Sequence, residues 1–533
     1  MAIDFDPNIS YLEYIKQNQV EIAAPALHQL NQILDNCQWE QPETALDLNN
    51  LAVAALVAAE SCDNAFTHDL YAEIAFDAVQ AGFELNQHPL CAAHLALINC
   101  MLGNYSEAAQ IAFSAFINNL QPAYNEANIH QAIVYIPPVL STNITNSRSE
   151  QLLQILNTNN GCIQAILMLS EVLCQTQISL DNQTGLRLLN LMIQLMPNSI
   201  SSNMRLGIYN IGNQQLEGLI YLHRANKLAP SNPIILQSLY LAYRDLEQPE
   251  LANYWQQIGL NSVQQQLDEL SWQWTKLKLN SPWTYIPFIG AAARKGNPDI
   301  LMTVPASLQS LTTRCLLAEG DWFERELEFW RQYVQPGMTV IDVGAGVGVY
   351  TFSAARLVGT SGVVYAIEPF SDAVDCLHET CRINQIENVK VLQNAVGDRD
   401  GKVKLILQSP SELNYLAPID TSLDLDTEVK EVVCITLDTF IQQAKLDRVE
   451  VIKISTEGNE LAVLIGGEQI LTTFAPTIVY HNHANRGIDL AAAQYLLDLG
   501  YELFRYQPYL QELIPLTSKT DFAEVVKAIA IPK

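Results

Sequence analysis

The sequence predicts an all-α helical array in its first half and an alternating α/β domain in its second half. From about residue 8 to residue 270, apolar residues recur at the spacing of amphipathic helices, with almost no strand-like alternation. Beyond about residue 300, strand-like and helix-like segments alternate, which indicates a parallel sheet with helices on both faces. A glycine-rich turn after the strand that ends at Val343 is the third observation.

Length and charge narrow the functional classes. At ~100–200 residues per domain, 533 residues suit two to four domains. Hydrophobic residues make up 49% of the chain, which excludes wholesale disorder. The formal net charge of −28 repels phosphate backbones and anionic lipid, so we expect neither nucleic acid nor a membrane surface as a partner.

The sequence also favours a cytoplasmic location without a membrane span. Residues 1–6 lack the basic start and the apolar run of a signal peptide. The most apolar stretch, residues 283–293, is about half as long as the ~20 residues that a spanning helix requires. None of the ten cysteines forms a Cys-x-x-Cys pair, so we interpret them as buried thiols in a reducing compartment.

The first half contains two similar stretches, residues 102–115 and 211–230. Each has a small residue at a turn and another where two helices would touch, and Pro197 and Pro230 are spaced as closing prolines. This pattern resembles the tetratricopeptide (TPR) repeat, most clearly over residues 199–232. The resemblance implies a TPR-like solenoid whose concave face binds a protein partner, although each small or aromatic position is also explained by helix packing alone.

We therefore predict three segments. A TPR-like helical repeat domain occupies residues 1–265, and repeats at 89–120 and 160–198 are weaker than the one at 199–232. A connecting segment follows over residues 266–300, where tryptophans, prolines and glycines break the helical rhythm. The α/β domain occupies residues 301–533.

The glycine-rich turn predicts a cofactor site. Asp342 lies near the end of the strand, and Gly344, Gly346 and Gly348 follow at alternate positions before a helix. Glu368 ends the next strand, where an acidic side chain can accept hydrogen bonds from a ribose. Binding sites for nicotinamide cofactors also combine a glycine-rich turn with an acidic residue, but their usual glycine spacing is Gly-x-Gly-x-x-Gly. The spacing here is typical of S-adenosylmethionine-dependent methyltransferases.

Further motifs follow in a fixed order. They comprise residues 319–324 before the first strand, the turn at 394–398, the strand end at 451–461 and the glycine pair at 466–467. Together with the glycine turn, they resemble the FkbM-type methyltransferase family across roughly residues 300–533. The resemblance implies a Rossmann-like class I fold and methyl transfer from S-adenosylmethionine to a hydroxyl of a glycan, glycolipid or polyketide-like acceptor.

The resemblance also implies roles for individual residues. Gly344, Gly346 and Gly348 would hold the amino-acid portion of the cofactor, and Asp342 would brace their loop. Glu368 would accept from the ribose hydroxyls, and Asn394 and Ala395 would lie beside the adenine. The residues expected where the fourth strand opens on the methyl group are Lys453, Ser455, Glu457 and Glu460.

Two positions depart from the family pattern. Ser455 stands where the family usually has Asp, and His481 stands where it usually has Glu. His481 can replace a carboxylate as base, because an imidazole titrates near neutral pH; a structural role, or a metal pair with His483, is left open. Lys453 is either a base or a bridge to a neighbouring carboxylate. As a base, it would be neutral or paired with Glu457. We assign no metal ligands.

Three functions remain open on the sequence alone. The first is a working O-methyltransferase whose array binds a partner or positions substrate. The second is a scaffold whose methyltransferase domain binds cofactor without turnover. The third is a protein methyltransferase. A glycan acceptor predicts aromatic side chains that face the cleft near Trp322, Tyr415 or Tyr480.

Overall fold

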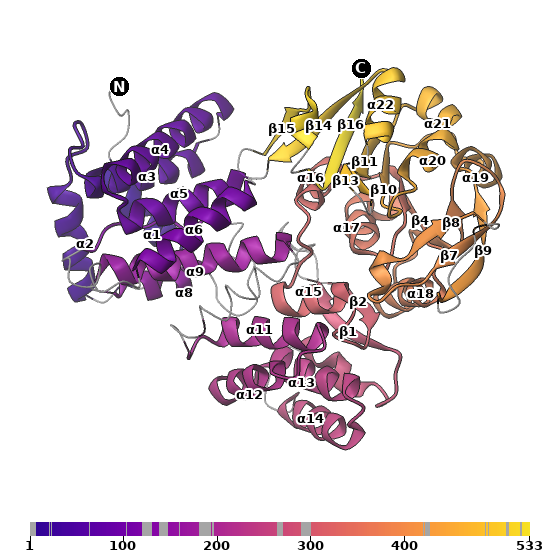
Figure 1. The fold of residues 1–533 in the computed structure, drawn as a ribbon, viewed down its shortest axis with the longest axis horizontal. Coiled ribbons are helices and arrows are strands. Elements are labelled where there is room, and N and C mark those ends of the chain that lie inside the picture. The colour runs from indigo at the N-terminus through magenta and orange to yellow at the C-terminus, as the bar shows by residue number, and fades with distance from the viewer. Residues whose placement is uncertain are drawn as a thin grey trace. The chain divides into compact units, whose positions relative to one another are not determined.

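The computed structural model divides the chain into two compact units (Figure 1). The first unit contains residues 1–202 and 507–510, and the second contains residues 203–506 and 511–533. The structure describes residues 7–533 except 21, 23, 63, 103, 120–129, 138–147, 159, 181–192, 194–196, 264–269, 289–299, 419–420, 422–426, 485–486, 489, 508–510 and 523–524.

The first unit is helical, as the sequence predicts. Its elements are α1 (Pro7–Gln17), α2 (Ala24–Asn36), α3 (Ala45–Glu60), α4 (Ala65–Asn86), α5 (Pro89–Leu102), α6 (Tyr105–Asn119), α8 (Arg148–Leu156) and α9 (Gly161–Leu180). Helix α3 begins at a capping box, in which the Thr44 side chain accepts from the Asp47 amide and the Asp47 carboxylate accepts from the Thr44 amide. In the described part of the chain, no helix combines the length and the apolar character needed to cross a bilayer.

The second unit begins with two further helix pairs. They are α11 (Ile200–Gly212) with α12 (Gly218–Leu228), and α13 (Pro233–Asp245) with α14 (Pro249–Ser262). A Cβ atom at Gly218 would lie 2.7 Å from the Gly207 carbonyl oxygen, so the first pair crosses at two glycines. The first pair falls on the repeat predicted at 199–232, but membership of the TPR class stays a prediction. The repeat predicted at 160–198 lies partly outside the described residues.

The two units meet at residue 202 in the chain, not at the predicted segment 266–300. Side chains of α11 and α13 bind the α/β domain. The Arg205 guanidinium lies 2.7 Å from the Glu319 carboxylate, both buried, and the Asp245 carboxylate accepts from the Leu308 amide. Within 266–300, the described residues form a 3₁₀ helix, η3 (Leu270–Lys276), with buried tryptophans, and a strand, β1 (Trp283–Phe288). Trp272 and Trp274, which interrupt the helical rhythm, are therefore packed in the core.

An eight-stranded sheet forms the centre of the α/β domain, with the order β15-β14-β16-β11-β10-β3-β4-β5. Its strands are β3 (Thr339–Val343), β4 (Val363–Ile367), β5 (Val389–Leu392), β10 (Val451–Ile454), β11 (Thr477–His481), β14 (Tyr501–Gln507), β15 (Glu512–Pro515) and β16 (Lys527–Pro532). Strands β3, β4, β5, β10 and β11 are parallel, and β16 runs antiparallel to β11 and β14.

Helices cover both faces of this sheet (Figure 1). One side carries α16 (Glu326–Tyr333), α17 (Val349–Val358) and α18 (Ser371–Asn384), and the other carries α19 (Leu437–Ala444), α20 (Glu460–Ile465), α21 (Glu468–Thr473) and α22 (Leu490–Asp498). Helix α15 (Leu311–Glu319) precedes them. The short 3₁₀ helices are η5 (Gly359–Ser361), η6 (Ser411–Leu413) and η7 (Lys519–Phe522). Three smaller sheets contain β1 with β2 (Ile300–Pro305), β12 (His483–Ala484) with β13 (Gly487–Ile488), and β6 (Ala395–Val396), β9 (Val429–Ile435), β7 (Gly401–Ile406) and β8 (Tyr415–Ala417).

Candidate active site

A cavity of ≈ 330 Å³ lies at the carboxyl ends of β3, β4, β10 and β11. The chain builds β3, β4 and β5 toward one edge and then returns to place β10 and β11 on the other side of β3. Ligands of open α/β sheets bind where the strand order reverses in this way. The cavity is therefore where the fold predicts a ligand.

The three glycines of the turn are required for different reasons. Gly344 has φ +68°, and a Cβ atom there would lie 1.9 Å from the Ser455 carbonyl oxygen. Gly346 has φ +55°, and a Cβ atom would meet nothing within 4 Å, so its main chain borders open space. Gly348 has φ +102° and immediately precedes α17, against whose Phe352 a side chain would collide. The loop is thus fixed by packing at its ends and open at its middle.

Asp342 and Lys453 are connected to this loop by an ion pair and hydrogen bonds. They are partners in the register of β3 and β10, and the Lys453 Nζ atom lies 3.1 Å from Asp342 Oδ1. Lys453 also donates to the Gly344 carbonyl oxygen at 2.7 Å, and Thr351 Oγ1 donates to Asp342 Oδ2 at 2.6 Å. Both side chains are buried. This is the bridging arrangement that the sequence left open for Lys453, and it links Asp342 to the loop through Lys453.

Glu368 lies on one side of the cavity, next to the glycine loop. Its carboxylate accepts from the Gly346 amide at 2.8 Å and from the Phe370 amide at 2.9 Å. Burial raises the pKa of Glu368, and the two amide donors oppose that rise. Asn394 and Ala395, at the start of β6, line the same cavity. Each carboxylate oxygen retains a second lone pair for a hydroxyl donor.

The opposite side of the cavity is built around a lysine that sequence reasoning did not identify. Lys527 is buried, and its Nζ atom lies 3.0 Å from Ser455 Oγ and 3.2 Å from Glu324 Oε1. Lys527 stands opposite His481 in the register of β16 and β11. Glu324 belongs to the approach motif, but no local spacing connects it with residue 527. Only the sheet topology brings these segments together.

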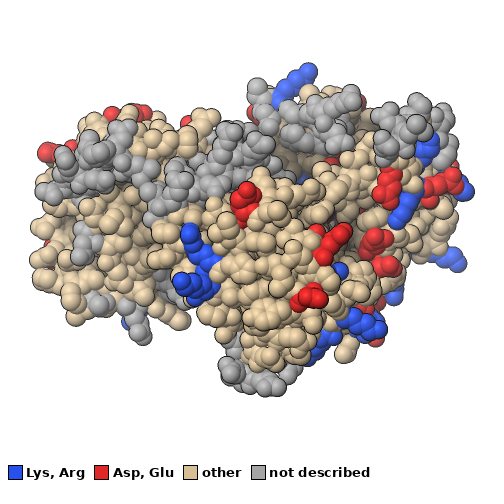
Figure 2. All heavy atoms as spheres, turned by 60° about the horizontal axis from the view of Figure 1, so that its bottom comes forward, with Lys and Arg blue, Asp and Glu red and all other residues tan. Residues whose placement is uncertain are grey.

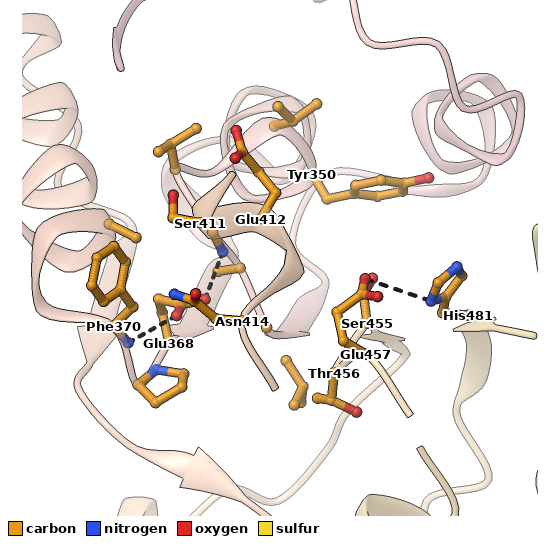
Figure 3. Close-up of a pocket in the computed structure, with 18 of the residues that line it drawn as sticks. Tyr350, Glu368, Phe370, Ser411, Glu412, Asn414, Ser455, Thr456, Glu457 and His481 are labelled. Carbon is orange, nitrogen blue, oxygen red and sulfur yellow. Dashed lines mark hydrogen bonds and ion pairs between the residues drawn. The ribbon is translucent and has the colours of Figure 1, made fainter. Parts of the chain in front are cut away.

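Glu457 and His481 form a second group on this opposite side of the cavity. His481 Nδ1 lies 3.7 Å from Glu457 Oε1 (Figure 3). Glu457 has φ +52°, a conformation that non-glycine residues rarely adopt and that is concentrated at functional sites. Burial raises the pKa of Glu457 to about 7, although the charge of Lys527 opposes the rise. Glu460, by contrast, accepts from the Thr456 and Gly458 amides and is a local helix-start contact.

The segment around η6 is a further part of the cavity that the sequence did not mark. Glu412 Oε1 accepts from Ser310 Oγ at 2.8 Å and from the Thr312 amide at 2.7 Å, at the start of α15. Asn414 Oδ1 accepts from the Gln408 amide at 2.7 Å. Both residues line the cavity. Neither residue lies in a recognisable sequence motif, so their position in the cavity could not be predicted.

Aromatic side chains line only part of the cleft. Trp322 and Phe323 line the cavity with ring centroids 4.5 Å apart. Tyr480 is instead fully buried in the hydrophobic core, so the expectation that it faces the cleft was wrong. It points inward because a central strand alternates its side chains between the two faces. Among the described residues, Tyr415 does not line the cavity, although Asn414 and Leu416 do.

Among the predicted site residues, all except Asp342, Gly348 and Glu460 line this single cavity. Figure 3 shows Glu368 beside Phe370 on one side and Glu457 beside His481 on the other. In the described part of the chain, no group of three or more His, Cys, Asp or Glu side chains is arranged to hold a metal ion.

The model of a known protein family matches part of this α/β domain. Residues 342–503 match the model of the methyltransferase FkbM domain. The matched range begins at the loop brace, Asp342, and includes Glu368, Glu457 and His481. The second unit therefore contains a methyltransferase α/β domain, whose matched part we call the FkbM domain.

Curated relatives are similar over a shorter range. The ribosomal protein L11 methyltransferases of Bacillus cereus (strain Q1) and Bacillus anthracis are each 37% identical over 92 residues, or 17% of this chain. The match covers 29% of each relative, so the chain spans less than a third of the length of these proteins.

Solved structures of methyltransferases are also similar. An FkbM methyltransferase from Methylobacillus flagellatus KT is 15% identical, with 46% of this chain and 57% of that chain covered and a TM-score of 0.26. A SAM-dependent methyltransferase from Aquifex aeolicus is 17% identical, with 39% and 87% covered and a TM-score of 0.23.

Proposed function

We propose that the chain is an S-adenosylmethionine-dependent O-methyltransferase that acts on a hydroxyl of a glycan, glycolipid or polyketide-like acceptor. The observation that carries this proposal is a single cavity with two differently built carboxylates, Glu368 and Glu457, on opposite sides (Figure 3). The FkbM domain match supports the reaction class. The aromatic pair Trp322 and Phe323 supports a glycan acceptor, because sugar rings stack on aromatic faces.

The residues on the cofactor side fit adenosylmethionine. Gly346 leaves its main chain open to the cavity, and Glu368 offers free lone pairs beside it. Glu368 would accept from the ribose hydroxyls, the glycine loop would hold the amino-acid portion, and Asn394 and Ala395 would border the adenine. When bound, this cofactor supplies a methyl group on a positively charged sulfur.

On the acceptor side, Glu457 would take the proton of the acceptor hydroxyl, because its pKa of about 7 suits a base near neutral pH. His481, 3.7 Å away, would orient that carboxylate or share the proton. Lys527 would hold Ser455 and Glu324 at the mouth of the strand. Lys453 would position the loop, since its ammonium already donates to Gly344 and pairs with Asp342.

The cofactor assignment is tested by titration calorimetry with adenosylmethionine. Glu368→Ala should weaken binding by about 1.5–3 kcal/mol, the usual contribution of hydrogen bonds to a charged acceptor. Glu502→Ala, which removes an exposed carboxylate on β14, is the matched control and should bind as the wild type does. Equal affinities of Glu368→Ala and wild type would remove Glu368 from the site, and a preference for NAD would overturn the proposal.

A protein acceptor is the second candidate, because the curated relatives are named as ribosomal protein methyltransferases. Incubation of a cell extract with labelled cofactor separates the two candidates. Label in the glycan, lipid or small-molecule fraction supports the first, and label in a protein supports the second. Cofactor binding with no labelled product would instead indicate a non-catalytic scaffold.

We also propose that nucleic acid is not a partner. The net charge of −28 disfavours phosphate backbones. On the face drawn in Figure 2, the described acidic and basic side chains are interspersed, and the basic ones form no broad patch.

A further inference from the structure

Residues 131–136 run as an extended, buried main chain through the helices of the first unit. Ala132, Ile133, Val134 and Tyr135 are each 0% exposed, and Ile136 is 1% exposed. This segment belongs to none of the helices or strands of the unit. A buried segment of this kind needs partners for its main-chain N–H and C=O groups, because unpaired ones are costly. Side chains of four helices supply them.

Alternate residues of the segment are each held at both main-chain groups by one side chain. Gln164 accepts from the Ala132 amide and donates to the Ala132 carbonyl, both at 3.0 Å. The Tyr11 hydroxyl accepts from the Val134 amide at 3.1 Å and donates to its carbonyl at 2.8 Å.

The Tyr14 hydroxyl does the same at Ile136, with both distances 3.1 Å. In an extended chain, residues 132, 134 and 136 present these groups at the same edge. Gln164, Tyr11 and Tyr14 therefore take the place of a neighbouring β-strand.

Two side chains that are hydrogen-bonded to each other bind the opposite edge of the segment. His94 Nε2 accepts from the Tyr135 amide at 3.2 Å, so the ring proton lies on Nδ1, 2.8 Å from Asn49 Oδ1. The Asn49 amide then donates to the Ile133 carbonyl at 3.2 Å. Burial lowers the pKa of His94 to about 4, which keeps the imidazole neutral and able to accept. We call the five side chains Tyr11, Tyr14, Asn49, His94 and Gln164 the strand cradle.

These contacts concern groups that every residue except proline carries. Contacts to main-chain groups provide affinity with little dependence on sequence, as in proteins that bind a peptide by adding it to a sheet edge. The five cradle side chains have no formal charge when His94 is neutral, and the segment itself is uncharged and includes β-branched Ile133 and Val134. At its end, Arg148 donates to the Ile136 carbonyl at 2.7 Å and pairs with Glu60.

We propose that the strand cradle is a binding site for an extended polypeptide main chain, which residues 131–136 fill as an intramolecular ligand. An uncharged, β-branched strand of a partner protein would compete for the same site. The inference concerns the first unit alone and is independent of methyl transfer.

The test uses the full chain with residues 131–136 replaced by an alternating Gly-Ser segment of equal length. The probe is a fluorescent peptide with the sequence of residues 130–137. Fluorescence anisotropy should show saturable binding to the replaced chain and at least about tenfold weaker binding to the wild type, and the peptide should raise the unfolding temperature of the replaced chain.

Two matched comparisons separate main-chain recognition from hydrophobic adhesion. A peptide N-methylated at the position of Val134 keeps its side chains and loses one donor, and it should bind about tenfold less tightly. In the replaced chain, Tyr11→Phe should weaken the unmodified peptide to a similar extent. Tyr240→Phe makes the same change at a tyrosine of the second unit and should have no effect on peptide affinity.

A second variant protects the test against misfolding. Ile133→Gly with Tyr135→Gly weakens the resident segment while it keeps all cradle residues and the main chain, so the peptide should bind it more tightly than it binds the wild type. If the replaced chain and the double glycine variant keep their helical circular dichroism but do not bind the peptide, the proposal is overturned. Equal binding of the N-methylated peptide would also overturn it. So would a loss of helical circular dichroism in both variants that the peptide does not restore, because the segment would then be an ordinary part of the core.

Discussion

The two sides of the cavity are built in different ways. On the cofactor side, the functional groups lie on three successive turns, and each turn directly follows its own strand: Gly344–Gly348, Glu368 and Asn394–Ala395. On the acceptor side, Glu324, Glu457, His481 and Lys527 come from distant segments that only the sheet topology assembles. The first side is therefore defined by local chain geometry and the second by tertiary contacts.

This difference extends to electrostatics. The Glu368 carboxylate has two main-chain amide donors that favour its charged form. Burial raises the pKa of Glu368 as well, although these donors oppose the rise. The pKa of Glu457 is raised to about 7, and so is that of Glu326, which does not line the cavity but interacts with the charge of Lys527. A cofactor site needs a fixed shape, whereas proton transfer needs a group that titrates near the working pH. Substitutions on the two sides should therefore have different effects on catalysis and on stability.

The largest effect should come from Glu457→Gln, which keeps the shape of the side chain and removes the base. The rate of methyl transfer from labelled cofactor to the acceptor fraction of an extract should fall ~10²–10⁴-fold, with cofactor affinity nearly unchanged. The wild-type rate should rise with pH through about 7, as the carboxyl loses its proton, and this limb should be absent in the variant. Glu502→Gln is the exposed control. A variant with the full wild-type rate would exclude Glu457 as the base.

If the cofactor side is fixed by main-chain geometry, two neighbouring glycines should respond differently to alanine. Both substitutions place a side chain at positive φ, at about 1–2 kcal/mol. Gly344→Ala adds a collision with the Ser455 carbonyl, which should reduce the free energy of unfolding by a further ~1–3 kcal/mol, an amount typical of overpacking. Gly346→Ala adds no collision. Denaturant titration of both variants makes the comparison, and equal losses would contradict it.

The same contrast explains how far the sequence could predict the site. The helical first part, the parallel sheet and the loop from Asp342 to Glu368 follow from local spacing and strand-end chemistry. Lys527 and Glu324 could not be paired in advance, because they are separated by the whole α/β domain. Tyr480 was placed on the wrong face because the orientation of one residue depends on the strand register. The interactions of Arg205 and Asp245 with residues of the α/β domain are likewise not visible in helical periodicity.

Restoration of the usual family residues should sharpen the acceptor-side assignment. In Ser455→Asp with His481→Glu, the carboxylate introduced at position 481 would lie close to Glu457, because His481 Nδ1 is 3.7 Å from that side chain. The carboxylate introduced at position 455 would compete with Glu324 for Lys527. Since like charges raise each other's pKa, we expect methyl transfer at pH 7 to fall about 10–100-fold and the acidic limb to move upward.

The single variants serve as controls for this double change. His481→Glu should account for most of the loss, because it adds the charge nearest to Glu457. A gain of activity in the double variant would mean the opposite, namely that Ser455 and His481 mark a site that has lost its function.

The last prediction concerns stability. It tests whether a buried carboxylate near this cluster lowers the free energy of unfolding when it is charged. Glu326 is buried beside this cluster, and burial raises the pKa of its carboxyl from 4.5 to about 7. Between these values the folded state binds more protons than the unfolded state, so this group lowers stability as pH rises from about 4.5 to 7 and then levels off. Glu326→Gln cannot ionise, and it should therefore match the wild type near pH 4.5 and exceed its stability by about 3 kcal/mol at pH 8. Thermal unfolding of both proteins across this range makes the measurement, with Glu502→Gln as the exposed control. A constant difference at all pH values would show that the side chain acts through packing and not through its charge.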